Sequence, residues 1–233
     1  MNLTEIENCF HFQYPPLYKQ LEEDGMLQVG EYGPNWYTTI FPKIKDNPTL
    51  FLHTFDFELL SVEAVKDAIE ELAHPEGYRQ IKPGFQFIPF GQNGAGDYYC
   101  FFPTEQEGDD LPIVFVEHDT GEAVYLAKNL QQYIFRVLLT DMSEQDTYNK
   151  VSDADFRANL QSVLKTHGKY LPASQLSILE EILWSEIQDY EITMPKGWKE
   201  PHRGLLTDVE LKKIMLETIP YSKMDTTFEY AEG

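Results

Sequence analysis

A glycine-dense turn between two apolar segments holds the residues that best fit a chemical role. It reads Gly91-Gln-Asn-Gly94-Ala-Gly96-Asp97, and closely spaced glycines can present backbone N–H groups to a phosphate. A dinucleotide-binding turn needs the order G-x-G-x-x-G followed by a helix, whereas here G-x-x-G-x-G precedes the strand-like segment 98–102. No Lys-Ser or Lys-Thr pair follows, and Asp97 would repel an anion. We therefore interpret the turn as a bend between two strands.

The cysteines lack the partners that nucleophilic catalysis needs. Cys9 lies two residues from His11, with no third group to orient the pair, and Cys100 lies among aromatic residues as a small buried hydrophobe would. The chain contains no G-x-S-x-G turn. We predict that the protein is not an enzyme and has no catalytic residue, with an uncharacterised hydrolase as a minor alternative.

Metal binding has little more support from residue spacing. The six histidines are scattered, without the H-x-x-x-H or H-E-x-x-H pattern of zinc sites. The densest group is Glu117-His118-Asp119 with Glu122, but neighbouring residues of a hairpin point to opposite faces and converge poorly on one ion. We predict no metal and no cofactor, and a weak surface cation site stays the alternative.

Acidic side chains are the most unusual feature of the composition. The chain has 39 Asp+Glu against 18 Lys+Arg, a net charge of −21, which repels nucleic acid. If two successive loops lie at neighbouring edges of one sheet, seven of these carboxylates crowd one rim. They are Glu105, Glu107, Asp109, Asp110, Glu117, Asp119 and Glu122. Such a rim would attract a basic protein partner, with Trp36, Tyr98 and Tyr99 as possible anchors. The alternative is that these carboxylates lie in solvated loops and bind no partner.

Composition also restricts where the protein works. Of the 233 residues 42% are hydrophobic and 14% aromatic, which suffices for a packed core. Two lone cysteines fit a reducing compartment, and the N-terminal segment has no secretory signal pattern. No apolar run approaches the roughly 18–20 residues of a membrane span. We expect a cytoplasmic protein without membrane contact, and its oligomeric state stays open.

The elements that must position these residues alternate between strands and helices. Apolar alternation and β-formers predict strands at 36–37, 49–57, 85–90, 98–102, 111–117 and 122–127. Gly121 supplies the left-handed residue of the last hairpin. Helical spacing predicts helices that begin near Pro16 and Ser61 and one over 129–142.

The predicted secondary structure changes after residue 142, from strands with interspersed helices to helices. A polar linker at 143–150 leads to predicted helices at 153–167, 173–190 and 208–218, with a Pro/Gly-rich loop at 194–204. Thr207 and Glu210 form a capping box for the last helix. Residues 1–142 carry 23 acids and 8 bases, against 16 and 10 in residues 143–233, so the acidity belongs mainly to the first part. We predict an α+β domain at 1–142 and a helical C-terminal extension at 143–233, packed on it or linked to it.

Several motifs occur in an order typical of one family. They are Tyr14-Pro15-Pro16-Leu17-Tyr18 with Asp24-Gly25, Leu59-Leu60-Ser61-Val62-Glu63, Phe87-Ile88-Pro89-Phe90-Gly91 through Tyr98-Tyr99, the segment 112–116 with His118, and Ala127-Lys128-Asn129-Leu130. Together they make residues 5–142 resemble the SUKH superfamily of Smi/Knr-like proteins. Asp24-Gly25-Met26 departs from the usual Asn-Gly-Gly, and about ninety residues follow the resemblance.

The resemblance implies a fold and a function. The fold is α+β, with a curved, mainly antiparallel sheet flanked by helices. The function is non-catalytic protein binding, most simply that of an immunity protein that neutralises a bacterial toxin by occlusion. Because nuclease toxins are commonly basic, an acidic inhibitor is physically sensible. The alternative is a regulatory or scaffold protein that binds a cellular partner.

Overall fold

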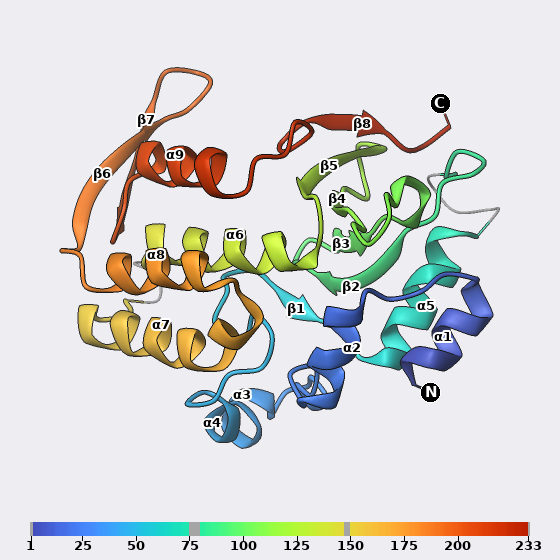
Figure 1. Ribbon diagram of the computed structural model, residues 1–233, viewed down its shortest axis with the longest axis horizontal. Helices are drawn as coiled ribbons and strands as arrows, with labels where there is room; N and C mark the ends of the chain where they lie inside the picture. Colours follow the sequence, from blue (N-terminus) through green and yellow to red (C-terminus); the bar gives the residue numbers. More distant parts are fainter. Residues whose placement is uncertain (1, 75–79, 147–149, 233) are drawn as a thin grey trace.

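A computed structural model describes residues 2–74, 80–146 and 150–232, and Figure 1 shows helices arranged around a central sheet. The sheet is open and antiparallel, with the strand order β1-β2-β3-β4-β5-β8. Its strands are β1 (Glu58–Leu59), β2 (Ile88–Gln92), β3 (Tyr98–Phe101), β4 (Ile113–Val116), β5 (Glu122–Ala127) and β8 (Thr227–Glu229). The α+β class is therefore confirmed.

Local capping signals explain where the helices begin. The helices are α1 (Leu3–Phe10), α2 (Pro16–Glu23), α3 (Trp36–Thr39), α4 (Phe41–Ile44), α5 (Val62–Leu72), α6 (Leu130–Ser143), α7 (Asp153–His167), α8 (Ala173–Leu183) and α9 (Asp208–Thr218). The Ser61 hydroxyl accepts a backbone bond from the first turn of α5, and the Asn129 side chain does the same for α6. The predicted capping box of Thr207 and Glu210 is present at α9.

Successive residues of β3 enter two hydrophobic clusters, because side chains alternate between the faces of a strand. Phe101 packs against Phe90 and Tyr18, with ring centroids 4.9 and 5.0 Å away, in the cluster that includes α2 and α6. Cys100 belongs to the other cluster, together with Tyr230 from the end of the chain. Burial raises the pKa of the Cys100 thiol well above its ordinary value, as expected of a core residue.

The segment 49–57 is not a strand, so this prediction is wrong. Phe51 and Asp56 have φ of 58° and 52°, in the left-handed region that interrupts a pleated strand. The chain turns repeatedly here, and pairing with β2 begins at Glu58, after the segment has ended. The strand predicted at 36–37 is also wrong, because those residues begin α3.

The C-terminal part contains strands that the sequence did not predict. Helix α8 ends at Leu183 rather than near 190, and a hairpin of β6 (Gln188–Thr193) and β7 (Lys199–Gly204) follows it. Strand β6 begins within the predicted helix, and β7 lies in the predicted loop. Arg157 of α7 explains the early end, because its guanidinium donates to the carbonyls of Leu183 and Ser185.

Residues 143–146 are attached to this hairpin rather than forming a detached linker. The Gln145 backbone N–H donates to the Arg203 carbonyl at 2.7 Å, and Ser143 is buried. Residues 147–149 of the predicted linker lie outside the described ranges.

Strand β8 returns to the main sheet beside β5 (Figure 1). Our division of the chain after residue 142 stays a prediction.

Candidate partner-binding surface

The seven predicted carboxylates lie at two opposite ends of the sheet, not on one rim. Strand β4 pairs with β3 so that Ile113 faces Phe101 at one end and Val116 faces Tyr98 at the other. The loop 102–112 leaves the first end, which we call the loop end. The hairpin 117–121 leaves the second, which we call the turn end. Consecutive antiparallel connections alternate between ends, so the single-rim expectation is wrong.

Lysines neutralise half of the predicted carboxylates at the loop end. Glu105 binds Lys223 with Oε2 and Nζ 2.6 Å apart, and Asp110 binds Lys128 with Oδ2 and Nζ 2.6 Å apart. The bond from Lys128 lowers the pKa of Asp110. The other two, Glu107 and Asp109, are exposed. Two of these four carboxylates therefore have a structural role that competes with partner binding.

The turn end brings the other three predicted residues, Glu117, Asp119 and Glu122, beside the β2–β3 turn. Asp97 of that turn accepts a bond from the His118 backbone N–H at 3.0 Å and contacts His118 Nδ1 at 2.7 Å. The hydrogen bond to Asp97 raises the pKa of His118. The two connections therefore form one continuous acidic edge.

Strand β8 adds a further carboxylate to the turn end. Glu229 lies directly opposite Glu122 in the β5–β8 register, and both are exposed. Like charges in this position repel each other. Lys82 lies 3.4 Å from Glu229 and offsets part of the repulsion.

The glycine-dense turn packs against the segment before β1. The Gly94 N–H donates to Asp56 Oδ1 at 2.8 Å. A Cβ on Gly91 would lie 2.5 Å from the ring of Phe57, so only glycine lets that ring lie across β2. The turn that resembles a phosphate loop therefore positions an aromatic ring and a carboxylate.

These residues border a partly open cavity of about 210 Å³, which we call the aromatic pocket. Its lining comes from the segment 29–59 and the glycine turn. The lining residues are Val29, Tyr32, Trp36, Tyr37, Phe41, Leu50, Phe51, Leu52, Thr54, Asp56, Phe57, Glu58, Leu59 and Gly94. Tyr32 and Trp36 form one wall, with ring centroids 5.0 Å apart, and Phe51 and Phe57 form another at 5.1 Å.

Large aromatic side chains are exposed around this pocket. Tyr37 is 76% exposed and Phe55, between two lining residues, is 74% exposed. Trp36 is buried, and its indole N–H donates to the Val29 carbonyl at 2.8 Å, which fixes the ring. Exposed aromatic groups beside carboxylates are typical of protein interaction sites rather than of catalytic centres.

Sequence patterns predict little of this pocket. Of the predicted anchors, Trp36 lines the pocket, whereas Tyr98 and Tyr99 are partly buried in the sheet. The available signal was the recurrence of Tyr32, Trp36, Tyr37 and Phe41 within ten residues. The segment 49–57 hid the other wall, because its alternation resembles a strand.

The family model described as the SMI1 / KNR4 family (SUKH-1) matches residues 2–136. The chain belongs to the SMI1/KNR4 family. A search of the curated proteins and a search of the solved structures found no match to this chain. The SUKH-1 match includes the aromatic pocket and the turn end except for Glu229, whereas most of the C-terminal part lies beyond it.

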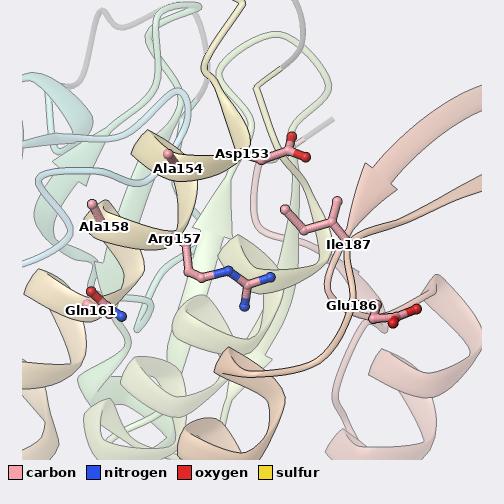
Figure 2. Close-up of a pocket in the computed structure, with 7 residues that line it drawn as sticks. All are labelled: Asp153, Ala154, Arg157, Ala158, Gln161, Glu186 and Ile187. Carbon is pink, nitrogen blue, oxygen red and sulfur yellow. The ribbon is translucent and has the colours of Figure 1, made fainter.

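A second hollow of this SUKH-1 protein, of about 560 Å³, lies beyond the family match (Figure 2). Asp153, Ala154, Arg157, Ala158, Gln161, Glu186 and Ile187 line it. Its arginine is bonded to carbonyls at the end of α8, as described above, and Asp153 binds Arg203 with Oδ2 and Nη2 2.9 Å apart. The charged side chains of this hollow therefore hold neighbouring elements together and are not free to bind a partner. The aromatic pocket is the better candidate site.

The described parts of this SUKH-1 protein contain neither a metal-ligand cluster nor a membrane-spanning helix. Within residues 2–74, 80–146 and 150–232, no three His, Cys, Asp or Glu side chains are grouped to hold a metal ion. In the same ranges, no helix combines the length and apolar character needed to cross a bilayer.

Proposed function

We propose that this SUKH-1 protein is a non-catalytic, cytoplasmic immunity protein that neutralises a basic, nuclease-type bacterial toxin by covering its functional surface. Family membership supports protein binding as the general role. The toxin is the partner in this role, and it is recognised chiefly by the turn end. Glu107 and Asp109 at the loop end contribute only to the long-range attraction.

One observation supports the proposal best: the turn end combines exposed aromatic side chains with an acidic edge. Tyr37 and Phe55 can bury a large apolar area on binding, and Asp119 and Glu122 can attract a basic surface. Electrostatic attraction of this kind mainly increases the association rate. Occlusion then follows from contact and requires no catalytic residue.

A regulatory or scaffold role is the second candidate. It is favoured by the C-terminal part, which carries the exposed Trp184 on a surface outside the family match. In that case the partner would be a cellular protein, and residues 143–233 would contribute a second contact surface.

Coexpression tests the first proposal. A toxin domain encoded beside this gene is expressed in cells with and without the SUKH-1 protein, and growth is measured. We expect rescue, together with copurification of the two proteins. Absence of a neighbouring toxin gene, with copurification of housekeeping proteins only, would contradict the immunity role and support the regulatory one.

A further inference from the structure

We propose that the aromatic pocket binds the guanidinium group of an arginine side chain presented by a basic protein partner. The inference rests on the proposed protein-binding function and names the chemical group recognised at one corner of the turn end. Size, wall chemistry and charge of the pocket support it independently.

The size of the pocket fits one side chain. Its volume is about 210 Å³, whereas drug-sized ligands and cofactors occupy roughly 300–1,000 Å³. Buried Leu50, Phe51 and Leu59 supply an apolar base. An arginine matches this pattern because its methylene stem can lie along apolar surface while its flat, weakly hydrated head reaches polar groups.

The walls of the pocket suit a cation. Tyr32 and Trp36 have rings tilted by 32° with centroids 5.0 Å apart, and Phe41 lies 5.7 Å from Trp36. A guanidinium over the face of such a ring gains cation–π attraction and stacks well because it is planar. Trp and Tyr are the strongest aromatic partners for this contact.

The charge of the pocket is negative. Asp56 and Glu58 line it, and none of the described residues in its lining is basic. Asp56 Oδ1 accepts the Gly94 N–H, whereas Oδ2 accepts no hydrogen bond from the described part of the chain. Burial and then the charge of Glu58 raise the pKa of Tyr32 to about 12, so its hydroxyl stays protonated. An arriving guanidinium would provide the missing positive charge.

The surroundings favour a protein over a small free amine. Tyr37 and Phe55 are exposed at the pocket, and the acidic edge continues from Gly94 to Asp97 and His118. A free ammonium compound would leave these groups in water. A basic protein surface would cover them together with the pocket.

The three tryptophans allow a direct test. Trp184 and Trp198 are 69% and 52% exposed, so replacing both by Phe leaves Trp36 as the single indole reporter without disturbing the core. Acetyl-arginine-amide is titrated into this variant at constant ionic strength, and the indole N–H peak is followed by two-dimensional NMR. Acetyl-citrulline-amide, which has the same shape without the charge, and choline are titrated in parallel.

We expect a saturable shift of the Trp36 peak with the arginine probe and at least about tenfold weaker binding of citrulline and choline. Asp56→Asn with Glu58→Gln should weaken arginine binding about tenfold, and Tyr37→Ala should weaken it as well. The matched control, Glu180→Gln with Glu181→Gln on α8, removes the same charge and should change nothing. These sites are exposed, and circular dichroism checks that each variant is folded.

No saturable shift, equal binding of citrulline, or tighter binding of choline would overturn the inference. Growth rescue by the coexpressed protein tests the immunity role separately from arginine binding by the pocket. If the toxin is neutralised and Tyr37→Ala has no effect while arginine does not bind, the inference fails and the immunity role stands. If arginine binds but no toxin is neutralised, the immunity role fails and the pocket stands.

Discussion

One half-buried and one buried ionisable side chain, Asp141 and His167, hold the segment that lines the aromatic pocket. Asp141 of α6 accepts a bond from the Thr54 hydroxyl at 2.8 Å. His167 of α7 contacts the Phe51 backbone N–H through Nε2 at 3.4 Å and the Val163 carbonyl through Nδ1 at 3.0 Å. Because Phe51 adopts φ of 58°, this bond secures a backbone conformation that is otherwise unfavourable. Burial shifts the pKa of both groups, so the stability of the fold should depend on pH through each of them.

Replacing Asp141 by Asn should stabilise the protein at alkaline pH. Burial raises the pKa of Asp141 to about 7 from an ordinary 3.8. Since the folded pKa lies above the unfolded one, the ionised carboxylate costs stability, and the cost grows from about pH 4 to pH 7 and then persists. Asn accepts the Thr54 bond and never ionises. Urea unfolding should show a gain of about 1–3 kcal/mol at pH 8 that is mostly lost at pH 4.5. An equal gain at both pH values would contradict this assignment.

Replacing His167 by Gln should remove a pH dependence on the acid side. Burial lowers the pKa of His167 to about 4 from an ordinary 6.5. The unfolded chain therefore binds the proton first, so stability is full above pH 6.5 and is lost as pH falls towards 4, by up to about 3 kcal/mol. The stability difference between the native protein and His167→Gln should shrink over this interval. A constant difference would show that His167 does not titrate on unfolding.

At the scale of elements, contact between the C-terminal hairpin and α6 depends on one glycine. A Cβ on Gly204 would lie 1.9 Å from the Ser143 carbonyl oxygen, which neither backbone can avoid. Gly204→Ala should therefore destabilise the protein by about 2–4 kcal/mol, measured by urea unfolding. Gly33→Ala is the control, because a Cβ there meets nothing within 4 Å. Equal effects of the two changes would mean that the hairpin detaches at little cost.

Elements with local signals could be predicted from the sequence, and those defined by distant contacts could not. Caps and periodicity predicted α5, α6, α7 and α9, and the hairpin of β4 and β5 has Gly121 at φ of 74° as expected. The segment 49–57 has the alternation of a strand, but its aromatic residues pack on elements far away in the sequence. Phe51 packs on Tyr133 of α6 and His167 of α7, and the ring of Phe57 lies across β2. The acidic loop residues could likewise be identified one by one from the sequence. The end of the sheet at which each of them lies could be assigned only once the strand order was known.

At the scale of the whole molecule, the two acidic ends should contribute unequally to association. Asp119→Lys with Glu122→Lys at the turn end should slow binding of a basic toxin domain by about tenfold or more at low salt. Asp109→Lys with Asp110→Lys at the loop end should have a smaller effect. Stopped-flow association rates check both, and the difference should decrease as salt increases. Equal slowing by the two pairs would place the partner between the ends or over both.

Strand β8 makes completion of the sheet depend on the order of synthesis. Its partner β5 leaves the ribosome roughly a hundred residues earlier, which is about 5–20 s of translation. During that time β5 has an unpaired edge, the kind of edge from which aggregation starts. The most vulnerable moment of this protein is therefore expected to occur during its translation, with a duration determined by ribosome speed rather than by the stability of the finished fold.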